Sequence, residues 1–177
     1  MVNSANFPQC QCPIKTCTCS GGIHSYIPYY RKILDFLQPQ KIFEWGPGQN
    51  TILGLKTPSV KSIVAIEQDP QWIPKIEDTR FEVLVIPEHD PQYVHLHGHE
   101  DADIFFIDSR RRAECLDLVR MQALPQAVVC LHDAQRYRYH QALAKYNTVK
   151  FLDLGFAIAT RLPHPNLASL LVEESQW

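Results

Sequence analysis

Apolar positions along the chain follow two patterns, one typical of helices and one typical of buried strands. Residues 26–37 carry apolar side chains at intervals of three and four, which predicts a helix that stops before Pro39. Short apolar runs without strict polar alternation predict buried strands at 41–45, 62–67, 81–87, 102–108, 127–133, 149–155 and 156–162.

Helical or irregular segments separate most of these runs. A short helix is expected after the first strand, with Asn50 or Thr51 as its N-cap. Further helices are expected at 70–78, 111–124 and 137–146.

The order of the segments indicates the fold class. Buried strands that alternate with helices are typical of a parallel sheet covered on both faces. Only a turn separates 149–155 from 156–162, and a parallel pair needs a crossover of about a dozen residues, so these two strands must be antiparallel. We predict an α/β fold, a three-layer α/β/α sandwich whose mostly parallel seven-stranded sheet ends in an antiparallel hairpin.

Composition and charge narrow the class of protein. The 177 residues are 45% hydrophobic, as in a globular protein. Their formal net charge of −2 gives no strong electrostatic attraction to nucleic acid or anionic membranes. No apolar run approaches the roughly 20 residues that span a bilayer, and the N-terminus lacks the features of a signal peptide. A soluble cytoplasmic protein is expected, with a Cys-rich segment at 1–22 and a single α/β domain at 23–177. The oligomeric state stays open, a homo-oligomer included.

Polar residues end each of the first five predicted strands. The endings read "EWGPG", "EQD", "PEHD", "DSRR" and "HDAQR" in chain order. In an open α/β sheet, ligands bind outside the carboxyl ends of the strands. Five such endings in succession therefore predict a ligand site at this edge of the sheet.

The first ending holds two glycines one residue apart, Gly46 and Gly48. Glycine permits a tight turn and a close approach of the backbone to a ligand, although a plain strand-to-helix turn explains it too. The third glycine of a G-x-G-x-x-G pattern is absent, which weakens a dinucleotide interpretation. Glu67 ends the next strand, where an acid accepts hydrogen bonds from ribose hydroxyls.

The segments "FEWGPGQNT", "VAIEQDPQW", "ADIFFIDSRRR" and "AVVCLHD" resemble the motifs of class I S-adenosylmethionine-dependent methyltransferases, over roughly residues 24 to 172. The resemblance implies a Rossmann-like domain in which Glu44, Gly46 and Gly48 hold the methionine and ribose end of the cofactor. It also places Glu67 at the ribose hydroxyls, and Asp108 at the junction of cofactor and acceptor. Near the adenine it places Gln68, Glu88 and His89.

The resemblance further implies a methyl transfer, which we expect to be to an oxygen. Its candidate catalytic residues are Asp108, His132 and Asp133. In metal-dependent catechol-type O-methyltransferases, acids at the positions of Asp108 and Asp133 bind a divalent cation, but Ala134 stands where that family has an amide ligand. A direct base at His132 or Asp133 is the alternative.

An arginine cluster lies on the same predicted rim, with Arg110, Arg111 and Arg112 at a helix start and Arg136 and Arg138 in the facing loop. The positive end of a helix dipole repels arginines, so a cluster of them at a helix start suggests that they bind an anionic acceptor. A solvated helix start is the alternative. No inserted segment covers the predicted site, which suits a large or extended acceptor such as a glycan.

Cysteines and histidines form two further groups. Four thiols, Cys10, Cys12, Cys17 and Cys19, have the ligands for a structural zinc ion, and a redox-sensitive tail is the alternative. Cys115 and Cys130 lie in apolar segments and are expected to be buried thiols. The alternating His95, His97 and His99 are interpreted as exposed loop residues, with zinc ligation as the alternative.

Two other functions remain open from the sequence. An NAD-type oxidoreductase predicts a second nucleotide-binding half and a third glycine, and the chain shows neither. A non-catalytic nucleotide-binding domain with the same fold is compatible with every motif above, because fold does not imply activity.

Overall fold

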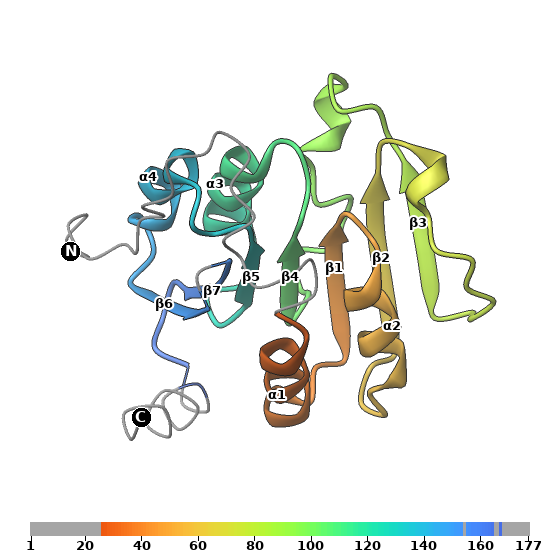
Figure 1. Cartoon of the computed structure of the whole chain (residues 1–177), viewed down its shortest axis with the longest axis horizontal. Helices are drawn as coiled ribbons and strands as arrows, with labels where there is room; N and C mark the ends of the chain where they lie inside the picture. Colours follow the sequence, from red (N-terminus) through yellow and green to blue (C-terminus); the bar gives the residue numbers. More distant parts are fainter. Residues whose placement is uncertain (1–25, 154, 165–166, 168–177) are drawn as a thin grey trace.

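The structure is a computed structural model that describes residues 26–153, 155–164 and 167. Its strands form one seven-stranded sheet in the order β3-β2-β1-β4-β5-β7-β6 (Figure 1). The strands are β1 (Lys41–Trp45), β2 (Ser62–Glu67), β3 (Phe81–Val85), β4 (Ile104–Ile107), β5 (Val128–His132), β6 (Thr148–Asp153) and β7 (Phe156–Thr160). The helices are α1 (Ile27–Leu37), α2 (Gln49–Lys56), α3 (Arg112–Gln122) and α4 (His140–Leu143), with 3₁₀ turns η2 (Pro70–Trp72), η3 (Pro91–Tyr93) and η4 (Tyr137–Tyr139).

Strand directions confirm the predicted mixed sheet. The pairs β1–β2, β1–β4, β2–β3 and β4–β5 are parallel, whereas β7 runs antiparallel to both β5 and β6. The strand order changes direction at β1, because β2 lies on one side of it and β4 on the other. Such a switch point separates the crossovers of an α/β sheet and opens a crevice at the strand ends.

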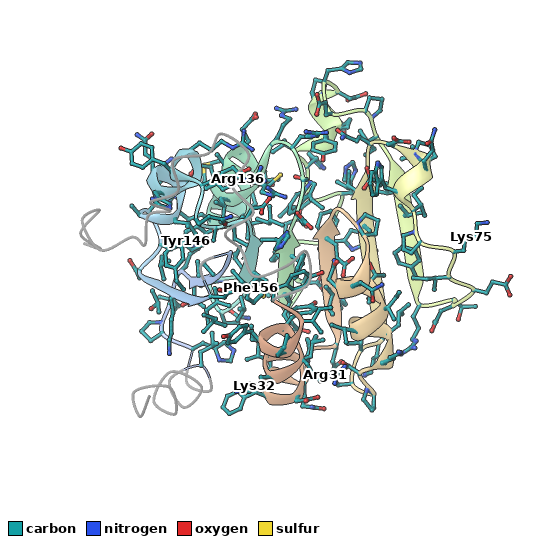
Figure 2. The ribbon with its side chains drawn as sticks, viewed as in Figure 1. Arg31, Lys32, Lys75, Arg136, Tyr146 and Phe156 are labelled. Atoms are coloured by element: carbon teal, nitrogen blue, oxygen red, sulfur yellow. The ribbon has the colours of Figure 1, made fainter. Side chains whose placement is uncertain are left out.

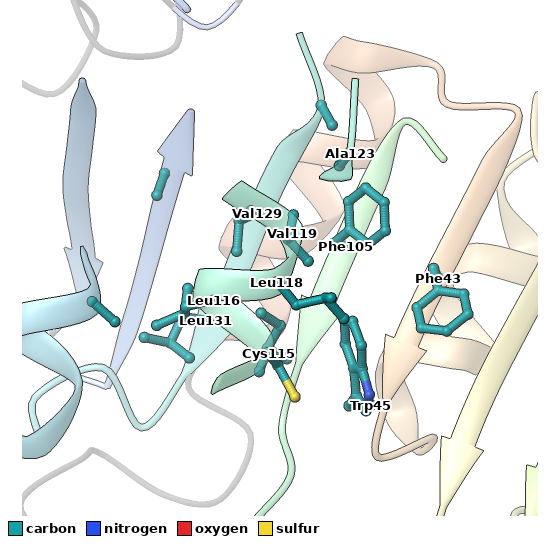
Figure 3. Packing of buried hydrophobic residues seen from close by; sticks show 14 of the residues in the cluster. Phe43, Trp45, Phe105, Cys115, Leu116, Leu118, Val119, Ala123, Val129 and Leu131 are labelled. Carbon is teal, nitrogen blue, oxygen red and sulfur yellow. The ribbon is translucent and has the colours of Figure 1, made fainter. Parts of the chain in front are cut away.

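Alternate residues of the central strands pack into two hydrophobic layers, one on each face of the sheet. Phe43, Phe105 and Val129 face α3 and α4, in a layer that also buries Trp45 (Figure 3). Ile42 and Phe106 face the other way, in the layer that buries the apolar side of α1. Because side chains alternate across a strand, runs that are apolar at every position bury both faces, as the sequence pattern predicts.

The first helix ends where the sequence predicts. Gln38 adopts the left-handed conformation and its N–H donates to the carbonyl of Leu34, at 3.0 Å. Pro39 follows and cannot extend the helix. Tyr30, Ile33 and Leu34 form the buried side of α1.

Three predicted helices differ from the structure. At 70–78 only the 3₁₀ turn η2 forms, because Pro74 disfavours helical geometry at Ile73, which is extended. The N-cap of α2 is Gly48, so neither Asn50 nor Thr51 caps it. The segment predicted at 137–146 is reduced to η4 and the four residues of α4.

Hydrogen bonds hold the irregular chain that replaces the helix at 70–78. Arg80 pairs with Asp78 at 2.7 Å. Its guanidinium also donates to the carbonyls of Val60 and Leu55, at 3.0 and 2.7 Å. The arginine thereby fastens the approach to β3 onto the end of α2.

The Cys-rich segment at 1–22 lies outside the described residues, and with it the predicted zinc ligands Cys10, Cys12, Cys17 and Cys19. The boundary between residues 22 and 23 stays a prediction. Among the helices that the structure describes, none has the length and apolar character needed to cross a membrane.

Candidate functional site

A cavity of about 320 Å³ opens at the carboxyl ends of β1, β2, β4 and β5. Its walls come from residues that follow or end these strands, which is where the sequence predicts a ligand. The lining residues are Gly46, Pro47, Glu67, Gln68, Trp72, Tyr93, Asp108, Ser109, Arg110, Arg112, Asp133, Arg136 and Arg138.

Gly46 brings the loop after β1 against the end of β4. Its φ is +88°, and a Cβ at this position would lie 2.2 Å from the backbone oxygen of Asp108. The N–H of Gly46 donates to Ile66 at 3.0 Å, and the N–H of Asp108 donates to Trp45 at 2.8 Å. A side chain at residue 46 would force these strand ends apart.

Gly48 has a different environment. Its backbone is extended, and the nearest atom to a Cβ there would be Oδ1 of Asn50 at 3.3 Å. The fold itself therefore demands a glycine at 46 far more strongly than at 48.

Glu44 lies below this loop and is fully buried. The hydroxyl of Thr51 donates to Glu44 Oε2 at 2.6 Å and accepts the N–H of Gly48 at 2.9 Å, so the acid ties β1 to the start of α2. Oε1 of Glu44 has no partner among the described residues. Burial raises the pKa of Glu44 to about 8, although hydrogen bonds from Thr51 and Asn50 oppose the shift.

Glu67 ends β2 at the cavity edge and is 9% exposed. Its Oε1 accepts the backbone N–H groups of Gln68 and Asp69, at 2.7 and 3.0 Å. These bonds fix the carboxylate, and its Oε2 has no donor within the described part of the chain. Beside it, Oε1 of Gln68 is buried without a partner there.

An ion-paired network forms the opposite wall. The guanidinium of Arg112 contacts the carboxylates of Asp108 and Asp133, the latter at 2.9 Å. Asp133 also pairs with Arg136 at 2.7 Å. Nδ1 of His132 lies 3.1 Å from Asp108 Oδ1. The three predicted catalytic residues are therefore brought together, as the sequence expects.

Electrostatics keep Asp108 ionised. Burial alone would raise its pKa, but His132 and the Arg112 guanidinium more than offset burial, so the pKa of Asp108 lies below its usual value. Arg112 is the buried partner, with 7% of its surface exposed, and it also donates to the hydroxyl of Tyr139 at 3.1 Å.

The same residues bear on the predicted divalent cation. Ligand atoms of Asp108, His132 and Asp133 lie within 4.8 Å of one another, a spacing that a metal ion can bridge. The Arg112 guanidinium, however, already contacts both carboxylates, and its positive charge balances their negative charge. A metal ion does not fit beside it without displacing the arginine.

Some predicted site residues lie away from the cavity. Glu88 and His89 are exposed and do not line it, and Arg111 binds the carbonyl of Glu88 at 3.1 Å. His132 stands behind Asp108, with its ring 4.8 Å from that of Tyr26. Glu44 and Gly48 support the loop without forming the wall.

The cavity also contains residues that sequence reasoning missed. Tyr93 is 2% exposed, and its carbonyl accepts the indole N–H of Trp45 at 2.8 Å. Tyr93 lies in the segment between β3 and β4, where the apolar residues follow no helical or strand period, so the sequence does not predict its burial. Trp72, the last residue of η2, is 73% exposed and follows Glu67 by five residues.

Of the three histidines predicted to be exposed, His95 is exposed, whereas His97 and His99 are half-buried, and the His99 ring lies 5.6 Å from that of Phe43. His95 and His97 lie in a hydrogen-bonded turn, where the N–H of His97 donates to His95 Nδ1 at 2.9 Å, so they are not arranged along a strand. Cys115 and Cys130 are buried free thiols, which confirms that prediction.

Comparison with known proteins finds similarity in structure only. No protein-family model matches the chain, and no curated protein is similar in sequence. A methyltransferase-like protein from Silicibacter pomeroyi has a TM-score of 0.61 at 16% identity, over 88% of this chain and 95% of its own. The chain has the class I methyltransferase fold.

Two further structures agree with this fold. The SAH-bound methyltransferase PaMTH1 of Podospora anserina has a TM-score of 0.56 at 16% identity, over 76% of this chain and 77% of its own. Spermidine synthase from Thermotoga maritima has a TM-score of 0.60 at 17% identity, over 75% of this chain. The chain spans about three fifths of the spermidine synthases it matches, 59% and 60% of their lengths.

Proposed function

We propose that the protein is an S-adenosylmethionine-dependent methyltransferase that acts on an oxygen of its acceptor. The observation that carries the proposal is the cavity wall, where the Gly46 backbone, the Glu67 carboxylate and the Asp108 carboxylate meet at the switch point of the sheet. Structures with this fold include SAH-bound methyltransferases, which supports the assignment.

The polar atoms of the cavity suit such a cofactor. Glu67 offers a fixed carboxylate whose Oε2 can accept hydrogen bonds from two ribose hydroxyls. Gln68 offers a buried acceptor, Oε1, which lacks a donor within the described residues and matches a nucleotide N–H or O–H group. Gly46 and Pro47 supply backbone without a long side chain at the methionine end. Glu88 and His89 remain predicted adenine contacts that would need the β3–β4 segment to move.

The bound cofactor would supply an electrophilic methyl group on a sulfonium. The acceptor oxygen forms a bond to the methyl carbon while the bond from that carbon to sulfur breaks, and sulfur keeps the electron pair. The protein must hold the two reactants in line, which is the larger part of the rate enhancement in such a transfer.

The roles of the wall residues follow from their contacts. Asp108 faces the cavity, and its carboxylate takes up the proton of the acceptor hydroxyl, while His132 lies against that carboxylate. His132 acts through Asp108, so we assign it as a positioning residue. Asp133 is held by Arg112 and Arg136 and orients both arginines toward the acceptor.

Two other activities fit the cavity less well. A dinucleotide-binding sheet is parallel in the order 3-2-1-4-5-6, whereas here β7 pairs antiparallel with β5, and the loop after β1 lacks the third glycine of the G-x-G-x-x-G pattern. A polyamine, the product named for two of the similar structures, is a polycation, and Arg110 and Arg138, which have no carboxylate partner in the described part of the chain, would repel it from this wall.

A competition experiment separates these functions. The purified protein is incubated with S-adenosylmethionine carrying a labelled methyl group, and retention of label is challenged with S-adenosylhomocysteine or NAD. We expect S-adenosylhomocysteine alone to compete. Competition by NAD, or no retained label, would overturn the proposal. Transfer of label to hydroxylated acceptors, and its loss in Asp108→Asn, would then establish catalysis.

A further inference from the structure

A second, smaller cavity of about 190 Å³ adjoins the first at the start of α3. We call it the arginine pocket and define it by its lining residues: Arg110, Arg111, Arg112, Ala113, Glu114, Arg138 and Tyr139. Arg110, Arg112 and Arg138 line both cavities, so the arginine pocket opens beside the Asp108 wall.

The charges in the arginine pocket do not balance. Arg112 is neutralised by Asp108 and Asp133, and Arg111 by Glu114. Arg110 and Arg138 have no carboxylate partner among the described residues. Two positive charges are therefore left over at the junction of the cavities.

Arg138 is held in place although its charge is not neutralised. Its guanidinium donates to the hydroxyl of Tyr139 at 2.7 Å and lies 4.9 Å from the centre of that ring. Tyr139 is in turn bonded to the buried Arg112. An arginine fixed by a neutral hydroxyl and a ring face keeps its other N–H donors available for an anion.

The start of α3 adds a further source of positive potential. No side chain caps this helix, whose 11 residues begin at Arg112. The first N–H groups of a helix lack internal partners and lie at the positive end of its dipole. Ala113 and Glu114 place this end on the pocket wall. Phosphate groups bind at such ends when basic side chains converge there.

We propose that the arginine pocket binds a phosphate group of the methyl acceptor, with Arg110 and Arg138 as its ligands. The assignment rests on the proposed function only in making the ligand the acceptor. A phosphate offers oxygens in several directions, which matches donors that arrive from Arg110, Arg138 and the helix end. A carboxylate carries one negative charge, whereas a phosphate monoester carries about 1.5 to 2 at neutral pH, which matches the two guanidinium groups that lack a carboxylate partner.

The pocket is tested by titrating methyl phosphate into the full chain, with ³¹P NMR or calorimetry as the readout. The variants are Arg110→Gln, Arg138→Gln and their combination. Arg31→Gln is the matched control, because Arg31 is exposed on α1 and lies far from Arg136 (Figure 2), which lines the first cavity. We expect each pocket variant to weaken methyl phosphate binding about tenfold, the double variant to weaken it further, and the control to match the wild type.

Acetate, which carries a carboxylate in place of the phosphate, is titrated in the same way. Stronger binding of methyl phosphate than of acetate, lost in the double variant, supports the pocket as a phosphate site. Equal binding of both anions, or methyl phosphate binding that the double variant retains, overturns it. S-adenosylhomocysteine binding by the wild type is measured separately, so a failure of the proposed function is distinguished from a failure of the pocket.

Discussion

The backbone oxygen of Asp108 occupies the space that a side chain of residue 46 would need, 2.2 Å from the ideal Cβ position of Gly46. This contact sets the separation between the loop after β1 and the residue that we place at the point of methyl transfer. The cofactor loop and the acceptor wall are therefore linked by this close approach and by the hydrogen bond from Asp108 N–H to the carbonyl of Trp45.

Replacing Gly46 with alanine should be costly for two reasons. The positive φ costs an L-residue about 1–2 kcal/mol, and relieving the contact with Asp108 adds about 1–3 kcal/mol. Gly98 has a similar φ of +84° with nothing within 4 Å of a Cβ, so Gly98→Ala isolates the first cost. Denaturant unfolding should show Gly46→Ala to be the less stable variant, and equal losses would contradict the contact.

Glu44 should make stability depend on pH in the opposite direction from a carboxylate whose pKa is lowered in the folded state. Its folded pKa of about 8 lies above the value of 4.5 for a free side chain, so the folded state binds the extra proton between these values. The free energy of unfolding contributed by this group therefore falls as pH rises from about 4.5 to about 8.

Glu44→Gln mimics the protonated acid and should remove this dependence. Thermal melting of the two proteins should give similar values near pH 5 and a higher melting temperature for the variant near pH 8. Glu77→Gln, at an exposed loop position, serves as the control. A variant that melts below the wild type at pH 8 would show that Glu44 is stabilising as a carboxylate.

Arg112 should act as a built-in counterion for Asp108 and Asp133. Removing one partner of a buried ion pair costs about 3–5 kcal/mol, so Arg112→Met should be strongly destabilised. Because the variant leaves two carboxylates and His132 within 4.8 Å, we expect millimolar Mg²⁺ or Mn²⁺ to raise its melting temperature.

The wild type and Arg31→Met should not respond to these ions in the same melting assay. A wild type stabilised by Mg²⁺ as strongly as the variant would show that a cation displaces the arginine. The metal-dependent interpretation of Asp108 and Asp133 would then be correct.

The sequence predicts the site as far as strand ends determine it. Apolar runs locate the strands, and parallel strands bring their carboxyl ends to one edge, so the position of Glu67 and Asp108 at that edge follows from the pattern alone, whereas the role of Asp108 comes from the family resemblance. The final hairpin follows from a turn too short for a crossover. These inferences hold because they depend on local spacing and on one geometric rule.

Other features depend on contacts between distant parts of the chain. Arg112 lies in a predicted helix start, and nothing local shows that it reaches Asp133, 21 residues later. Tyr93 lies in a segment without apolar period, so its burial against Trp45 has no signal in the sequence. The missing helix at 70–78 was predictable, because Pro74 disfavours it by local geometry alone.

The central claim is that the Glu67 carboxylate binds the ribose of S-adenosylmethionine in the cavity beside Gly46. The most direct measurement is calorimetric titration of S-adenosylhomocysteine into the wild type, Glu67→Gln and the control Glu77→Gln. Glutamine keeps an oxygen for the N–H groups of Gln68 and Asp69 but presents an amide where the ribose needs an acceptor. We predict that Glu67→Gln binds at least about tenfold more weakly, as expected for losing a charge-assisted hydrogen bond, while the control binds like the wild type. No binding by the wild type, or equal binding by all three proteins, would contradict the account.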